Sequence, residues 1–289
     1  MALLTILANC QAGPMAALIS QFCPDLNVIR SPLVHQITDK NRLEVIQNIQ
    51  KSDIVIHQPL GPSFKELSTA ELKSKFPSKT FVSFPSIFFG GLFPQLSYLR
   101  LPEGGTMKGP LSDYHDTRII DCFLNRESSE VCLGRMKSED PLELKYYDIS
   151  LKESLGRDRA VDIPVMEIIL DEMSKSPPLF TFNHPTNRVL WRVLERVLKL
   201  LGLQAPQALD LLPEREFLGN TRAMIPDSIP KSLGLDWRQP KYSIWEDELP
   251  LRELITSFYQ LYNEIPNFPA ICRDNEQRFN LPVRLGHYS

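Results

Sequence analysis

The sequence lacks the motifs by which common metal and nucleotide-cofactor sites are recognised. It contains no HxH, HExxH, GxGxxG or Walker A pattern, and no two of its cysteines are spaced as CxxC. We therefore expect neither a zinc or iron site nor a nucleotide cofactor bound in the usual ways. The sequence also lacks an apolar run of about 18 residues, so we expect no membrane span.

The sequence also has little net charge and no cysteine pattern typical of disulfides. The net charge is −3 and no Lys/Arg-rich block is present, which gives no electrostatic footprint for nucleic acid. The five cysteines are an odd number, which argues against a disulfide framework and predicts reduced thiols in a cytoplasmic compartment. The apolar stretch before Cys10 has no preceding Lys or Arg and is too short for a typical secretion signal.

The first part of the chain alternates short apolar runs with helical periodicity. This alternation predicts an α/β fold with a mainly parallel sheet and flanking helices. Ser68, followed by Glu71 three residues later, forms a capping-box pattern, and Asp39 is a second expected cap. The predicted strands cover residues 3–8, 26–30, 53–57 and 80–84, and the predicted helices cover residues 14–22, 39–50 and 68–76.

After about residue 110 the pattern becomes largely helical. We expect helices at residues 112–124, 165–173, 185–201 and 250–264, and one short strand at residues 179–182. Ser112 is the expected cap of the first of these helices, and Pro185 the expected first residue of the third. The chain is thus predicted to have an α/β part at residues 1–110 and a mostly helical part at residues 111–289, packed as one compact unit.

Cys10 is the predicted centre of any chemistry. It follows the first predicted strand and precedes a helix, and open α/β sheets bind ligands outside the carboxyl ends of their strands. The positive end of the helix dipole would favour its thiolate. A small buried core thiol is the alternative interpretation. The flanking Asn9 and Gln11 favour a site, because buried amides must find partners.

Other polar side chains also follow predicted strands. His57 and Gln58 end the third strand, so we expect them at the same edge of the sheet as Cys10. His184 is expected at a helix start, where a neutral imidazole suits general acid–base chemistry, and with Cys10 it would make a nucleophile pair. His115 is expected in the first turn of a helix, where a solvated position is the alternative.

In their order and spacing these motifs resemble the WcbI family. The matching segments are LANCQA at 7–12, HQP at 57–59, PSIFFGGLFP at 85–94, YHD at 114–116 and FNHP at 182–185. Members of this family are polysaccharide-biosynthesis proteins that bind coenzyme A and are regarded as acetyltransferases of capsular sugars. Ala8 replaces a glycine usual in the family, and Leu92 and Phe93 replace a more polar stretch, which leaves the acceptor open.

The resemblance implies a coenzyme A-dependent O-acyltransferase that uses acetyl-coenzyme A and a sugar or polysaccharide precursor. Cys10 and His184 would be catalytic: either Cys10 carries the acyl group, or it lines the site while His184 deprotonates the acceptor hydroxyl. N–H groups of the side chains or backbone near Gln11 and Gln58 would stabilise the oxyanion.

The resemblance also implies a set of binding residues. Arg118, Arg188 and Arg192 would contact the coenzyme's phosphates. A Ser/Cys-type esterase-like hydrolase using the same Cys–His site, or a non-catalytic ligand-binding protein, are the alternatives. The remaining residues expected to bind substrate or cofactor are Asn9, Gln11, His57, Gln58, Tyr114, His115 and Asn183.

Overall fold

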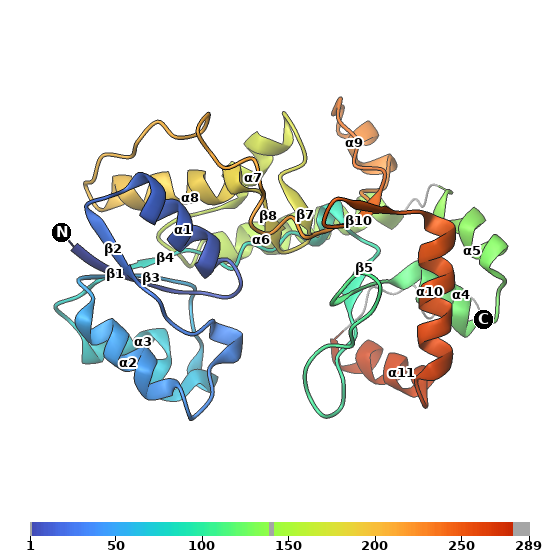
Figure 1. Cartoon of the computed structure of the whole chain (residues 1–289), viewed down its shortest axis with the longest axis horizontal. Coiled ribbons are helices and arrows are strands. Elements are labelled where there is room, and N and C mark those ends of the chain that lie inside the picture. The colour runs from blue at the N-terminus through green and yellow to red at the C-terminus, as the bar shows by residue number, and fades with distance from the viewer. Residues whose placement is uncertain (1, 139–141, 280–289) are drawn as a thin grey trace. The chain divides into compact units, whose positions relative to one another are not determined.

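The computed structural model describes residues 2–138 and 142–279, and the chain divides into two compact units (Figure 1). The first unit consists of residues 1–88, 152–179 and 183–218, and the second of residues 89–151, 180–182 and 219–289. Each unit is therefore assembled from segments far apart in the sequence. The division of the chain at residue 110 stays a prediction.

The first unit is built on a four-stranded parallel sheet, which confirms the predicted fold class. Its strand order is β2-β1-β3-β4, and all three neighbouring pairs run parallel. Strands buried on both faces need continuous apolar runs, and β3 is buried along its whole length. The strands are β1 (Ala2–Leu7), β2 (Leu26–Ile29), β3 (Ile54–His57) and β4 (Thr80–Ser83).

Helices cover both faces of this sheet. Figure 1 shows α1 and α8 on one face and α2 and α3 on the other. The chain leaves β1 through α1 and returns to β3 through α2, so the side of the connection changes between these two neighbouring strands. The carboxyl ends of β1 and β3 therefore form the switch point at which open α/β sheets bind ligands. The helical elements are α1 (Ala12–Phe22), α2 (Arg42–Lys51), α3 (Thr69–Lys75), α7 (Met166–Met173) and α8 (Asn187–Leu200), with 3₁₀ turns η1 (Val34–Gln36) and η2 (Pro62–Leu67).

The second unit is mainly helical and contains small antiparallel sheets. Helix α10 packs against α4 and α5 (Figure 1). Strand β5 pairs with β6 in an antiparallel sheet. None of the helices within residues 2–138 and 142–279 is both long and apolar enough to cross a bilayer. The elements are η3 (Gly90–Leu92), β5 (Leu96–Tyr98), β6 (Tyr114–Asp116), α4 (Thr117–Leu124), α5 (Ser129–Met136), β9 (Thr221–Arg222), α9 (Ser228–Ser232), β10 (Tyr242–Ile244), β11 (Asp247–Leu249), α10 (Leu251–Glu264) and α11 (Phe268–Phe279).

Three further elements lie where the chain passes from one unit to the other. They are α6 (Leu142–Asp158), β7 (Leu179–Thr181) and β8 (His184–Pro185). The short strand predicted at residues 179–182 is confirmed as β7. Helix α10 confirms the predicted helix at residues 250–264, and α7 confirms the one at residues 165–173.

The helix caps of the first unit agree with the sequence at one position and differ at another. The Ser68 hydroxyl accepts a hydrogen bond from the Glu71 N–H, which confirms the predicted cap of α3. Asp39 does not cap α2, because the helix begins later, at Arg42. Asn41 precedes it, and its side-chain oxygen accepts instead from the Thr38 N–H, which forms a turn before the helix.

Two other predicted helix starts are wrong. Residues Tyr114–Asp116 form β6 and pair with β5, so α4 begins only at Thr117, with Asp116 rather than Ser112 as its cap. Pro185 lies in β8, and α8 begins after Thr186, whose hydroxyl accepts from the Val189 N–H. In both cases the residues predicted to begin the helix form a short strand instead, and the helix begins after it.

Candidate functional site

Cys10 lies in the turn between β1 and α1, at the switch point of the sheet. The Ala12 N–H donates to the Asn9 carbonyl and closes this turn. Among the five cysteines, all of which the structure describes, Cys10 alone is not buried. The fold therefore presents one half-exposed thiol at the sheet edge where a ligand is expected.

Three amide side chains, those of Asn9, Gln11 and Gln58, form a hydrogen-bonded cluster at the turn that holds Cys10 and are called the amide cluster below. Oε1 of Gln58 accepts from the Asn9 N–H at 3.0 Å, and its Nε2 donates to Oε1 of Gln11 at 2.9 Å and to Oδ1 of Asn9 at 3.3 Å. Nε2 of Gln11 donates to the carbonyls of Ile87 and Asn183 at 2.9 and 3.0 Å. The cluster thus joins the segments that follow β1, β3 and β4 to the segment before β8.

The orientation of the Gln11 amide is fixed by its partners. Its Oε1 also accepts from the Ile87 N–H at 3.2 Å, while both acceptors of its Nε2 are carbonyl groups, which cannot donate. Both amide hydrogens of Gln11, and both of Gln58, are used inside the fold. The expected stabilisation of an oxyanion by N–H groups near Gln11 and Gln58 stays a prediction.

Asn9 connects the amide cluster to the thiol. Its Oδ1 accepts from the Gln11 N–H at 3.0 Å and lies 3.9 Å from Sγ of Cys10, in position to accept the thiol hydrogen. Its Nδ2 donates to the Ser86 hydroxyl at 2.9 Å.

Asn183 contacts the amide cluster through its backbone carbonyl, and His184 follows it in the chain. The Asn183 carbonyl accepts from Gln11, and His184 is the next residue, half-buried in β8. Because α8 begins three residues after His184, at Asn187, the imidazole is not at a helix start. The predicted dipole effect on His184 is therefore wrong, since such effects act within the first turn of a helix.

His57 ends β3, and its ring contacts Phe81 and the backbone of Gln58. The ring packs edge-on against Phe81 with 5.8 Å between centroids, and its Nδ1 donates to the Gln58 carbonyl at 3.2 Å. Burial lowers the pKa of His57, which keeps the ring neutral at physiological pH. Within the described residues its Nε2 is buried and has no hydrogen-bond partner. A binding role for His57 stays a prediction.

Tyr114 and His115 belong to the second unit. The Tyr114 hydroxyl accepts from the Thr181 hydroxyl at 2.9 Å. His115 is completely buried; its Nε2 donates to the Met107 carbonyl at 3.1 Å, and its Nδ1 accepts from the Tyr262 hydroxyl at 3.0 Å. Burial lowers the pKa of His115 to about 4, so the ring is neutral. Their predicted roles in ligand binding stay predictions.

Arg118 is committed to a carboxylate within the second unit. Its guanidinium makes two parallel hydrogen bonds to Asp116, at 3.0 and 2.6 Å, and the Tyr242 hydroxyl donates to the same carboxylate at 2.5 Å. Burial lowers the pKa of Arg118, but the adjacent Asp116 carboxylate outweighs it and holds the pKa above its ordinary value. A role for Arg118 with the coenzyme's phosphates stays a prediction.

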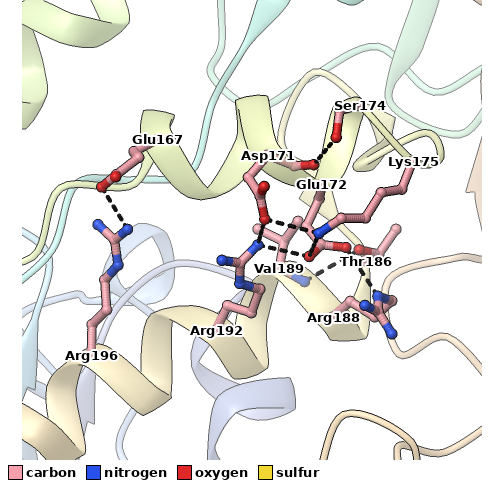
Figure 2. Close-up of polar contacts among 10 residues, drawn as sticks. All are labelled: Glu167, Asp171, Glu172, Ser174, Lys175, Thr186, Arg188, Val189, Arg192 and Arg196. Carbon is pink, nitrogen blue, oxygen red and sulfur yellow. Dashed lines mark hydrogen bonds and ion pairs between the residues drawn. The ribbon is translucent and has the colours of Figure 1, made fainter. Parts of the chain in front are cut away.

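Arg188 and Arg192 lie on α8 and pair with acidic residues of α7 (Figure 2). Arg188 donates to Glu172 at 3.0 Å, and Arg192 donates to Glu172 at 2.8 Å and also to Asp171. Glu172 is 2% exposed, and a carboxylate so deeply buried needs these partners. The predicted phosphate contacts of both arginines stay predictions.

Arg30 is an arginine that the sequence reasoning missed. It directly follows β2 and is exposed, and its guanidinium makes no hydrogen bond or ion pair with any described residue. It lines a cavity of about 460 Å³ together with Gly13 and neighbouring residues of α1. Its position just after a strand end is the same signal that identified Cys10 and Gln58, and could have found it.

Comparison with known proteins identifies the family. A family model described as the polysaccharide biosynthesis enzyme WcbI matches residues 3–206. A solved structure of WcbI, described as the native protein without a disulfide bond between coenzyme A and one of its cysteines, has the same fold. The two chains share 14% identity and a TM-score of 0.77 over 97% of this chain and 96% of that one. No curated protein matches the sequence. The chain belongs to the WcbI family of polysaccharide biosynthesis enzymes.

Proposed function

We propose that this chain is a coenzyme A-dependent O-acyltransferase that transfers an acetyl group to a sugar or polysaccharide precursor. The observation that supports this most is the position of Cys10, the one cysteine of five that is not buried, at the switch point of the sheet. The description of the solved relative mentions a disulfide between coenzyme A and a cysteine, which requires a protein thiol beside the coenzyme's sulfur. We infer that Cys10 is that thiol here.

In the proposed reaction the acceptor hydroxyl attacks the carbonyl carbon of the thioester. His184 takes the hydroxyl proton as the new carbon–oxygen bond forms. The carbon–sulfur bond then breaks, and the imidazolium returns the proton to the departing thiolate. The products are a sugar ester and coenzyme A with a free thiol.

Direct transfer is favoured over an acyl group carried on Cys10. The reactive form of a cysteine is its thiolate, and Oδ1 of Asn9 lies where it accepts the thiol hydrogen. In this arrangement Cys10 lies beside the sulfur of the donor and carries no acyl group. Its role is then to help hold the thioester in position.

Substitution of His184 tests the proposal most directly. His184→Ala should lower kcat by about 10²- to 10⁴-fold and leave the Kd for coenzyme A nearly unchanged, because a general base acts in the chemical step. Both constants are measured with acetyl-coenzyme A and a sugar acceptor, by steady-state kinetics and calorimetry. His35→Ala is the matched control, since His35 is an exposed histidine of the same unit.

The other outcomes separate the alternatives. If His184→Ala keeps full transfer but loses the coenzyme, His184 is a binding residue and the assigned role is wrong. If Cys10→Ser binds the coenzyme but transfers nothing, the acyl group travels on Cys10. If the protein cleaves acetyl esters with water and ignores coenzyme A, it is a hydrolase. If it binds coenzyme A, shown by a raised Tm, but never consumes acetyl-coenzyme A, it is a binding protein.

A further inference from the structure

A small cavity lies in the first unit, between the segment that follows β4 and the end of α6. We call it the Asp158 cavity. Its volume is about 10 Å³, which is roughly the room that one buried water oxygen needs. The cavity therefore takes a single polar group, and a larger ligand could place only one hydroxyl in it. Its walls include Ser86, Phe88, Arg157, Asp158 and Met166.

Asp158 supplies a hydrogen-bond acceptor to this cavity. The residue is 8% exposed, and its Oδ2 accepts from the N–H groups of Val165 and Met166, at 3.1 and 2.7 Å, where α7 begins. Its Oδ1 is also buried, and it has no hydrogen-bond partner in the part of the chain that the structure describes. A buried carboxylate oxygen is costly unless it receives a hydrogen bond. The fold thus leaves one strong acceptor for a donor group of a ligand.

Ser86 supplies a donor to the same cavity. Oδ1 of Asn9 accepts from the backbone N–H of Gln11, which fixes the orientation of the Asn9 amide, so its Nδ2 donates to the Ser86 oxygen at 2.9 Å. Among the described residues, the hydrogen of the Ser86 hydroxyl has no acceptor. Because the cavity is so small, one oxygen in it lies close to both Ser86 and Asp158. A hydroxyl group, which both donates and accepts, fits this pair, whereas Asp158 repels a phosphate or a carboxylate.

The rim of the cavity adds an aromatic ring. Phe88 is 38% exposed, so its ring is accessible beside the cavity. The Arg157 guanidinium lies 5.7 Å from the centroid of this ring and donates to the Phe88 carbonyl and to the Ser154 hydroxyl, both at 2.7 Å. These contacts hold the rim in place. An apolar ring surface beside a carboxylate and a hydroxyl suits a sugar, which combines hydroxyl groups with an apolar face of C–H groups.

We propose that the Asp158 cavity binds one hydroxyl group of a sugar, which donates to Oδ1 of Asp158 and accepts from the Ser86 hydroxyl, while the sugar ring lies on Phe88. The Asn9 amide joins this subsite to the thiol, because its Nδ2 contacts Ser86 and its Oδ1 lies 3.9 Å from Sγ of Cys10. The inference deepens the proposed function and rests on it for the identification of the sugar as the acyl acceptor. Binding of the sugar itself does not require acyl transfer.

The test titrates the full chain with the methyl glycosides of glucose, galactose and mannose and measures each Kd by NMR, without coenzyme A. Asp158→Asn keeps one oxygen for the N–H groups of α7 but removes the charge, so the Kd should rise about 10- to 100-fold, the effect of one hydrogen bond to a charged group. Ser86→Ala removes a neutral donor and should raise the Kd about 2- to 10-fold. Asp162→Asn is the matched control, because its carboxylate accepts from Ser83 and does not line the cavity.

Monodeoxy analogues of the glycoside that binds most tightly identify the hydroxyl in the cavity. One analogue should bind the native protein about as weakly as the parent glycoside binds Asp158→Asn, and Asp158→Asn should weaken that analogue no further. A variant that is merely misfolded would lose affinity for the parent and all analogues alike. Ser86→Ala leaves the contacts of Asp158 with α7 intact, so it keeps the test decisive if Asp158→Asn does not fold.

The outcomes separate this inference from the proposed function. If none of the three glycosides binds, or if both variants bind them as the native protein does, the cavity holds only solvent and the inference is overturned. If a glycoside binds in an Asp158-dependent way but acetyl-coenzyme A is never consumed, the subsite stands and the proposed function fails. If acetyl transfer to a sugar proceeds with the same KM for that sugar in Asp158→Asn and Ser86→Ala, the proposed function stands and the subsite is overturned.

Discussion

The two units of the chain hold their most prominent polar motifs in different ways. In the first unit, neutral amides fix the turn around Cys10, and the thiol itself stays half-exposed. In the second unit, Asp116 and Arg118 form an ion pair that is almost entirely buried. Next to them in sequence, His115 is completely buried between aromatic rings, with both ring nitrogens bonded.

The two motifs differ in whether a reactive group remains exposed to a ligand. Each motif satisfies its own hydrogen bonds, as buried polar groups must. Only the first leaves a reactive group that a ligand can reach. In the second motif the carboxylate and the guanidinium bind each other, and both nitrogens of the imidazole are hydrogen-bonded within the unit. Both motifs are equally conspicuous in the sequence, and burial is what distinguishes them.

Arg118→Met should have the largest effect on stability. It leaves the Asp116 carboxylate buried with the Tyr242 hydroxyl but without its cation, which typically costs about 3–5 kcal/mol. Denaturant unfolding measures this loss. Arg196→Met is the matched control, because its ion pair with the exposed Glu167 should contribute less than about 1 kcal/mol. Equal losses in the two variants would mean that the buried pair does not stabilise the second unit.

His115 should make stability depend on pH below neutrality. Its pKa is about 4 in the folded protein, compared with 6.5 as the ordinary value, because burial disfavours the charged ring. Between these values the unfolded chain binds a proton that the folded chain does not. Stability should therefore be complete above pH 6.5 and fall by about 3 kcal/mol as the pH drops to 4. His115→Gln should remove that part of the slope, and unfolding at several pH values in both proteins measures the difference. Identical slopes would show that His115 can be protonated in the fold.

The strands of the first unit could be predicted well from the sequence. Each is a short apolar run between turn residues. Parallel strands that are buried on both faces have such continuous apolar sequences, so the pattern identifies them. Gln58 lies beside the Cys10 turn, as its place after a strand end of the same parallel sheet predicted, because its side chain accepts from the Asn9 N–H. The need of Gln11 for partners could be predicted from its being an amide next to a buried strand, but not which groups those partners are.

Other features depended on partners distant in sequence and could not be predicted. Tyr114–Asp116 is a strand because it pairs with Leu96–Tyr98, and nothing local indicates that pairing. His57 ends a strand as expected, but its ring packs on Phe81 of the neighbouring strand. The carboxylate partners of Arg188 and Arg192 lie on a different helix, so the sequence alone could not show that these cations are already paired.

Gln58→Leu should have a smaller effect on stability than Arg118→Met and a specific effect on the site. It removes the acceptor of the Asn9 N–H and one donor each to Gln11 and Asn9, at a cost of about 1–3 kcal/mol. Because the turn is then held less firmly, Cys10 should react several-fold faster with a thiol reagent under native conditions. The four buried cysteines should not react.

Gln95→Leu is the matched substitution in the second unit. Gln95 is also fully buried, and its Nε2 donates to the Met224 carbonyl and the Tyr242 hydroxyl. Its Oε1 has no partner among the described residues, so leucine removes an unsatisfied acceptor along with those two bonds. The loss of stability should therefore lie at the lower end of the range of about 1–3 kcal/mol. The reaction rate of Cys10 should not change, since the amide cluster is intact. If Gln95→Leu accelerates that reaction as much as Gln58→Leu does, the thiol reports overall stability rather than the amides that surround it, and the contrast between the two units fails.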